Sequence, residues 1–310
     1  MKLPINMPVS IKALILIGCL GAACLSGGCS LADAPQLANE LHFNLGAVSE
    51  IRISYDEENV TFLPSDNEEL VIKEYMNKRK KSYNAKVQEG EGRIQVREGK
   101  KPLFAQGFSR YVEVYLPQSY EKSLTVTTTN GAIKIADLDL QLTDLGVDSS
   151  SGSVAIEGIR ARNIRLASTS GPLSLGTITG EKIDLATTSG KITCQRLVGQ
   201  VDCVTTSGDI TVRSGTGLGE YRVNNSGQMK IAYSEVRGDL ILFNKNGPIH
   251  LRLPQALAFK FTGYSKNAAV HTSFAEFLTS EGKTSRGVVG TNPSCHVKVT
   301  GNNGNIRVEQ

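Results

Sequence analysis

The sequence predicts an all-β protein built as a single β-solenoid, a parallel β-helix-like stack of coils of about 19 residues. Two observations carry this prediction. A glycine recurs at a nearly constant spacing, and apolar residues alternate with polar ones on both sides of it. A third observation is that residues 40–118 carry strand patterns without this glycine, which predicts an irregular, strand-rich N-terminal cap.

The recurring glycine follows a triplet of Ser, Thr or Asn residues, as in Thr-Thr-Ser-Gly at 187–190 and 205–208. Successive glycines are 21, 19, 19, 18, 19, 20 and 57 residues apart, and 57 is three times 19. The last gap therefore predicts two degenerate copies, one of them at 259–270. We expect glycine to supply a positive φ at each corner without steric cost. These anchor glycines are Gly131, Gly152, Gly171, Gly190, Gly208, Gly227, Gly247 and Gly304.

Apolar residues lie two and four positions after every anchor glycine, and seven and five positions before most of them. This period of two predicts half-buried strands, so that each copy reads as strand, corner, strand and connector. Stacked copies can bury apolar faces that a single copy cannot. The copy at Gly227 is shifted by one residue, which predicts a bulge. The pairs after the glycine are Ile133/Ile135, Val154/Ile156, Leu173/Leu175, Ile192/Cys194, Ile210/Val212, Met229/Ile231, Ile249/Leu251 and Ile306/Val308.

The N-terminal segment has the pattern of an export signal. Lys2 and Lys12 precede residues 13–32, which carry no charge and are most apolar at 13–17. The stretch 25–30, Leu-Ser-Gly-Gly-Cys-Ser, resembles a bacterial lipoprotein signal, in which small residues precede a cysteine that becomes diacylated. The resemblance implies a lipid on Cys29, although the branched residue stands one place too early.

Cys19 and Cys24 are the alternative lipidated residues, and an uncleaved anchor helix or an ordinary signal peptide is the alternative to lipidation. The expected organisation is a signal peptide at 1–28, a tether at 29–39, irregular strand-rich rungs and a cap at 40–118, and solenoid repeats at 119–310. A small separate β domain is the alternative for 40–118. The basic stretch 76–82 is expected to be a solvated loop that could touch anionic lipid near the tether.

The repeats carry a family resemblance. The Thr-Thr-Ser-Gly-x-Ile-x-Ile pattern, preceded by Tyr-Val-Glu-Val-Tyr-Leu-Pro at 111–117, resembles a bacterial adhesin-like family of β-solenoids. The resemblance covers residues from about 110 to 310 well and those from about 45 to 110 weakly. The molecular function of that family is largely unassigned, so the resemblance implies a fold and not an activity.

Composition and charge exclude several classes of protein. The chain of 310 residues has 40% hydrophobic residues, 31 Gly and no Trp, which fits neither a polytopic membrane protein nor a disordered chain. The formal net charge is +4, and it falls to +2 without Lys2 and Lys12. A nearly neutral chain argues against nucleic acid as a partner.

Few residues are candidates for catalysis or for metal binding. Asp184 and Asp202 occupy equivalent places in successive copies, so we expect them to stack and point outward, where a solvated surface is favoured over a Ca²⁺ site. Cys194 and Cys203 are expected to be small buried core residues, with a disulfide as the alternative, and Cys295 is left over. The histidines lack the spacing of metal ligands. No catalytic residue, metal or cofactor is expected, and no enzyme activity.

The triplets before the anchor glycines form a polar strip, in which ladders of hydroxyl groups are expected to stabilise the stack. The alternative is a flat face for a glycan or another protein. The sequence therefore predicts an exported, lipid-anchored protein of the bacterial cell envelope, facing the extracytoplasmic side, that binds or scaffolds without catalysis. A polysaccharide-active enzyme is the second hypothesis. The third is an envelope sensor or a subunit that assembles through an uncapped last rung near Gln310.

Overall fold

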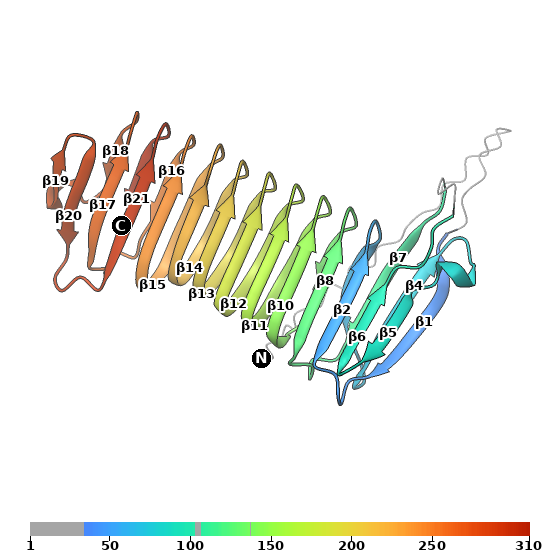
Figure 1. Ribbon diagram of the computed structural model, residues 1–310. Helices are drawn as coiled ribbons and strands as arrows, with labels where there is room; N and C mark the ends of the chain where they lie inside the picture. The colour runs from blue at the N-terminus through green and yellow to red at the C-terminus, as the bar shows by residue number, and fades with distance from the viewer. Residues whose placement is uncertain (1–33, 103–106, 137) are drawn as a thin grey trace, which may run out of the picture. The chain divides into compact units, whose positions relative to one another are not determined.

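The computed structural model describes residues 34–102, 107–136 and 138–310, and these form one compact unit. The lipidation candidates Cys19, Cys24 and Cys29 lie outside the described residues. The unit is a stack of β-coils in which the strands of successive coils lie side by side (Figure 1). The prediction of an all-β solenoid is confirmed. None of the helices in the described ranges is long and apolar enough to cross a membrane.

Twenty-two strands and two single-turn 3₁₀ helices, at Lys81–Tyr83 and Ala275–Phe277, make up the unit. The N-terminal strands are β1 (Gln36–Asn44), β2 (Glu50–Tyr55), β3 (Asn59–Pro64), β4 (Glu69–Met76), β5 (Lys86–Gly90), β6 (Arg93–Arg97) and β7 (Arg110–Leu116). The central strands are β8 (Ser123–Thr128), β9 (Ile133–Ile135), β10 (Gln141–Ser149), β11 (Val154–Ser168), β12 (Leu173–Thr187), β13 (Ile192–Thr205), β14 (Ile210–Val223) and β15 (Met229–Asn244). The C-terminal strands are β16 (Ile249–Arg252), β17 (Phe259–Ser265), β18 (Val270–Thr272), β19 (Leu278–Glu281), β20 (Thr284–Val289), β21 (Cys295–Gly301) and β22 (Ile306–Glu309).

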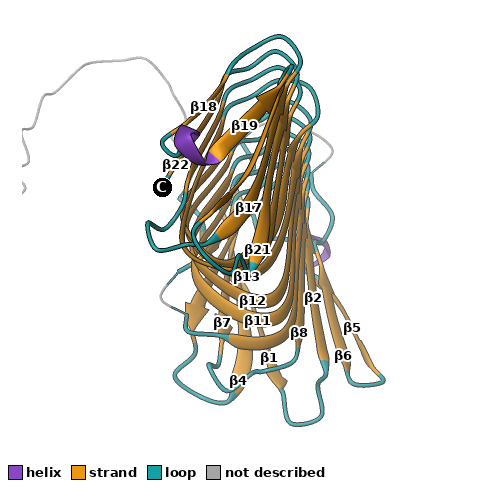
Figure 2. Cartoon of the chain, turned by 90° about the vertical axis from the view of Figure 1, so that its left-hand side faces the viewer, coloured by secondary structure: helices purple, strands orange, loops and turns teal. Residues whose placement is uncertain are grey.

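Each coil has a narrow corner at the anchor glycine and a rounded bend opposite it, as the end view shows (Figure 2). We call the part of the stack before each corner the pre-corner sheet, and the part after it the post-corner sheet. Strands β11 to β15 belong to both, because each leaves one corner, passes round the bend and enters the next coil without a break. The expected connector is therefore wrong: that part of the coil is bent strand, paired to its neighbours.

The core is a set of aliphatic columns that run along the stack. Parallel pairing puts each residue two places after an anchor glycine directly beside its equivalent in the next coil. Their side chains are almost completely buried, which removes an apolar surface from water in every coil. This confirms the predicted interior column, whose members are Ile133, Val154, Leu173, Ile192, Ile210, Met229, Ile249 and Ile306.

The anchor glycines stand at the corners for a different reason from the one expected. Of the eight, Gly227 alone has a positive φ, at 152°. At every anchor position an added Cβ would come closer than 3.0 Å to a backbone carbonyl oxygen of the neighbouring coil. At Gly152, for example, that oxygen belongs to Gly131. Glycine is thus required because the corners of adjacent coils pack backbone against backbone.

The irregular copy at Gly227 has its extra residue in the corner itself. Val223 pairs with Thr205 in the preceding coil and with Asn244 in the next, so it takes the place of a polar corner residue. Four residues then lead to Gly227, where three lead from Thr205 to Gly208. The corner that ends at Gly227 is one residue longer, and Gly227 is the anchor glycine with a positive φ. An inserted residue changes the local backbone conformation in this way.

At the C-terminal end the chain folds back into its own stack. β17 and β18 form the last coil, and β20 pairs antiparallel with β17 and with β19. β21 then lies between β15 and β17, and β22 lies between β16 and β18 (Figure 1). Of the two degenerate copies expected, the one at 259–270 exists, and a β-hairpin replaces the other. The expectation of an uncapped last rung near Gln310 is wrong, since Gln310 follows an inserted coil.

The N-terminal end repeats this arrangement in reverse order. β2 lies between β6 and β8, and β3 lies between β7 and β9, so the first coil of the sequence is the second of the stack. β5 pairs antiparallel with β6, and β4 pairs antiparallel with β7 and with β1. Antiparallel strands therefore cover both strands of the terminal coil at the N-terminal end, and they cover β17 at the C-terminal end, where β18 pairs, among the described strands, with β22 alone. This cover limits edge-to-edge pairing.

Candidate functional site: a groove along the bend

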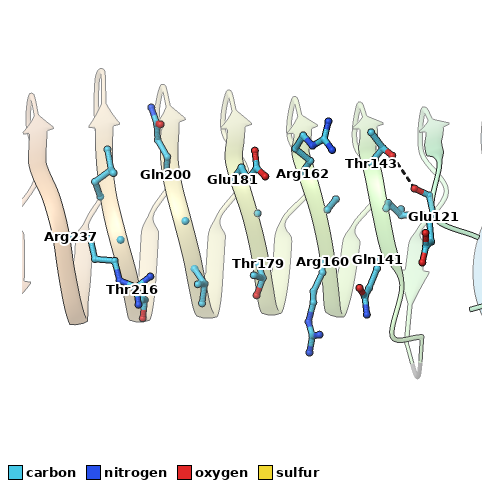
Figure 3. A pocket seen from close by; sticks show the side chains of 17 residues that line it. Glu121, Gln141, Thr143, Arg160, Arg162, Thr179, Glu181, Gln200, Thr216 and Arg237 are labelled. Atoms are coloured by element: carbon cyan, nitrogen blue, oxygen red, sulfur yellow. Dashed lines mark hydrogen bonds between the residues drawn. The ribbon is translucent and has the colours of Figure 1, made fainter.

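A groove of about 840 Å³ runs along the bend of the coils (Figure 3). It crosses β10 to β14 and ends near Glu121 on one side and Arg237 on the other. The sequence reasoning did not find it. Because the chain bends here, the side chains on either side of the bend splay apart and leave an open channel between them.

The floor of the groove carries almost no side chains. Ala161, Gly180, Gly199 and Gly217 follow one another in successive coils at the bend. Gly199 and Gly217 have positive φ values of 139° and 122°. An added Cβ at Gly199 would collide with the carbonyl oxygen of Gly180, and one at Gly217 with that of Gly199. This second glycine series has the same period as the corners, and at Gly199 and Gly217 glycine is required because the backbones of neighbouring coils approach closely at the bend.

Two rows of side chains form the walls, one on each side of the floor (Figure 3). Both rows are mostly polar, and their members repeat at the strand spacing of about 4.8 Å. The Thr143 hydroxyl donates to the Glu121 carbonyl oxygen at one end, and Arg237 forms a two-pronged ion pair with Glu235 at the other. One row is Gln141, Arg160, Thr179, Val198 and Thr216, and the other is Thr143, Arg162, Glu181, Gln200 and Leu218.

The polar strip at the corners is divided between the inside and the outside of the stack. The first residue of most triplets points inward, and at several corners its side chain holds the corner: the Thr187 hydroxyl donates to the Gly190 carbonyl oxygen at 2.8 Å, and the Gly247 amide donates to Asn244 Oδ1 at 3.0 Å. The later residues are mostly exposed. The strip is therefore first of all corner chemistry, as the sequence reasoning favoured.

Side-chain amides form a ladder along the C-terminal part of this strip. Asn303 Nδ2 donates to Asn246 Oδ1 at 2.6 Å, and Asn267 Nδ2 donates to Asn303 Oδ1 at 2.6 Å. Asn225 continues the ladder toward Ser207. These bonds tie the inserted coil to both neighbours and use amide groups that a ligand would otherwise need.

The predicted carboxylate pair is present on the outer face of the pre-corner sheet. Asp184 pairs with Asp202, and Asp202 with Glu220, so three carboxylates stack in neighbouring coils. Partial burial raises the pKa of Asp202, and the negative charges of Glu220 and Asp184 add to this effect. Lys182 lies 3.4 Å from Asp184, and Arg222 pairs with Glu220. Neither these carboxylates nor any other group of three or more His, Cys, Asp or Glu side chains in the described parts of the chain is placed so that it could hold a metal ion.

A buried ion-pair network lies in the N-terminal coils. The guanidinium of Arg110 is completely buried and donates to Glu58 at 2.8 Å and to Glu98 at 3.0 Å. Burial and the neighbouring Glu58 raise the pKa of Glu98 to about 7. Lys101 lies 3.4 Å from Glu98. Each charge has a partner. The network therefore joins the start of β7 to the segments beside β3 and β6, and it is not expected to hold a ligand.

The cysteines behave as core residues. Cys194, Cys203 and Cys295 are buried and free of disulfides. Cys194 lies in the post-corner column between Leu175 and Val212, and burial raises its pKa to about 12. Burial also raises the pKa of Cys203, which occupies a column of the pre-corner sheet. The protonated thiols are unreactive, which agrees with the predicted role as small apolar residues.

Two sheets joined by a narrow glycine corner and a grooved bend define a β-solenoid. The chain belongs to the family described as Toastrack DUF4097, which matches residues 48–224 and 205–309. No curated protein gives a significant match.

Solved structures of similar architecture come from three bacteria. A "putative adhesin" from Bacteroides fragilis is 11% identical with a TM-score of 0.47, covering 87% of this chain and 96% of that one. One from Parabacteroides distasonis is 11% identical with a TM-score of 0.42 and the same coverage of 87% and 96%. A "putative cell adhesion protein" from Clostridium sporogenes is 9% identical with a TM-score of 0.31, covering 89% and 99%. The fold assignment rests on the strand register and the family match.

Proposed function

We propose that this protein is a non-catalytic, adhesin-like binding or scaffold protein of the bacterial cell envelope, and that the groove along the bend binds an extended glycan. The observation that supports the proposal is the groove itself, which runs without interruption across five coils, β10 to β14. A long, open channel suits a linear polymer better than a compact small molecule.

The chemistry of the walls favours a glycan over a peptide. Glutamine, threonine and arginine side chains offer donors and acceptors at regular intervals, which suits the hydroxyl groups of a sugar chain. An extended peptide would bind by adding a strand to an open sheet edge. The backbone of the groove floor offers no such edge, because its strands are paired with the coils on both sides.

Replacing Val198 with Trp is expected to fill the middle of the groove and to weaken binding of a glycan ligand at least tenfold, about 1.4 kcal/mol. Val198 stands in one wall, between Thr179 and Thr216. The measurement is isothermal titration of a panel of bacterial envelope glycans, with ligands first identified on the wild-type protein.

Val204→Trp is the matched control, because Val204 faces outward from the same strand β13 on the pre-corner sheet. A ligand that binds Val198→Trp as tightly as wild type would refute the groove as its site. Cleavage of a glycan during the titration, seen as new reducing ends, would instead favour the polysaccharide-active enzyme.

We also propose that the protein is held at a membrane through a lipid on Cys29. The first strand, β1, begins at Gln36, and Arg79 Nη2 donates to Gln36 Oε1 at 2.9 Å. The exposed basic loop at 78–81 therefore lies beside the first strand. Seven residues reach about 25 Å at most, so a lipid on Cys29 would keep this loop close to anionic headgroups.

Cys29→Ala is expected to move the protein from the membrane fraction to the soluble fraction, because one lipidated residue would supply the anchor. Cell fractionation and the intact mass of the extracted protein measure this together. Cys24→Ala and Cys19→Ala are the controls and should leave the protein in the membrane fraction. If the Cys29→Ala variant stays in the membrane fraction with an unchanged lipid mass, the lipid is attached to Cys19 or Cys24 and not to Cys29.

A further inference from the structure

A second, smaller pocket lies on the outer face of the post-corner sheet, away from the groove. It has a volume of about 240 Å³ and is formed by β14, β15 and β16. Positively charged side chains surround it, namely those of Arg213, Lys230 and Arg252, and His250 also lines it.

The pocket exists because a small residue interrupts a column of long ones. Ile231 pairs with Val212 and with Leu251, and these three side chains point into the core. Ala232, the next residue, points outward and pairs with Arg252. Arg213, Ala232 and Arg252 each lie five residues after an anchor glycine and all line the pocket, so, in three successive coils, the short side chain of Ala232 lies between two arginines.

The cations of the pocket are poorly neutralised. Within the described residues, neither Arg213 nor Lys230 has a carboxylate within 4.0 Å. Arg252 has only Glu309, at 3.8 Å. Glu309 is already engaged, since it lies 3.0 Å from His250 Nε2 and also pairs with Arg307.

We propose that this pocket binds a tetrahedral oxyanion, the phosphate or sulfate group of an anionic envelope polymer. The two arginines lie on coils two apart, about 10 Å at the strand spacing, so their long side chains can approach one anion from opposite sides. A guanidinium group matches the oxygens of phosphate or sulfate with paired hydrogen bonds, and Lys230 adds a point charge. The site shares no residue with the groove, and it stands or falls independently of the function proposed for the groove.

Titration of the purified chain with inorganic phosphate and with sodium sulfate, followed by NMR chemical shifts at low ionic strength, tests the site. Saturable shifts are expected around β14 to β16, and sodium chloride at equal ionic strength should not produce them. Arg213→Gln and Arg252→Gln should each weaken the anion at least tenfold. A difference between phosphate and sulfate would identify which ester the pocket prefers.

Ala232→Leu separates a built pocket from diffuse attraction, because it fills the floor and leaves every charge in place. It is expected to abolish the saturable shifts while the melting temperature stays unchanged. Arg222→Gln removes the same charge from the pre-corner sheet and should bind as wild type does. Wild-type binding by Ala232→Leu, or equal weakening by Arg222→Gln, would overturn the proposal. The Val198→Trp variant, which blocks the groove, should bind the anion normally.

Discussion

Gly190→Ala is expected to destabilise the protein by about 3 kcal/mol, at the upper end of what overpacking costs. The new Cβ would collide with the carbonyl oxygen of Gly171 in the neighbouring coil. That oxygen is part of a paired backbone and cannot rotate away as a flexible side chain would. The coils would have to separate at the corner, which would lengthen the hydrogen bonds on both sides. Chemical denaturation followed by circular dichroism measures the loss.

Gly146→Ala is the matched control on the same stack. Its Cβ would meet only the Thr125 side chain, at ordinary contact distances of 3.6 and 3.7 Å, and its φ is not positive. Its free energy of unfolding should change by less than about 0.5 kcal/mol, as for surface substitutions elsewhere. Equal effects of the two substitutions would mean that the corners have room for a side chain, and close backbone packing would then not explain the anchor glycines.

Ile192→Asp should have the larger effect, a loss of about 4 kcal/mol or more, because it buries a carboxylate in an apolar column. Ile192 is completely buried between Leu173 and Ile210. No cation lies in that column to pair with the new charge. The expected result is insoluble or unfolded protein, measured by the soluble yield and by the melting curve.

Thr193→Asp places the same group one residue further along the same strand, where the side chain points outward between Ser174 and Thr211. This control is expected to fold and melt almost as the wild type does. A soluble Ile192→Asp variant with a wild-type melting curve would contradict the inward assignment of the column, and with it the stacking of the coils.

The columns could be predicted from the sequence because each coil repeats the same local pattern, and the period of two fixes which side chains face inward. Ile133 and Ile249 are far apart in the chain, yet both follow the same rule relative to their glycine. The ends could not be predicted in this way. The placement of β21 between β15 and β17 depends on pairing between distant strands, and no local pattern encodes it.

The groove had a signal that the sequence reasoning missed. Gly180, Gly199 and Gly217 each lie nine residues after an anchor glycine, so they form a second series with the same period. The corner glycines can be recognised in the sequence because Ser, Thr or Asn residues precede them. The glycines of the second series are not preceded by any shared residue type. The positive φ expected at every corner is found at one corner, Gly227, and at two of these three residues.

The inserted coils at both ends have a consequence for how the chain is made. β2 and β3 leave the ribosome before either of the coils that flank them, and β21 and β22 leave it after both of theirs. Until β21 and β22 have been made, the native pairing partner between β15 and β17 is missing. Coils in the middle, by contrast, can be gained or lost in evolution without disturbing either closure, which lets the length of the stack vary while its ends stay the same.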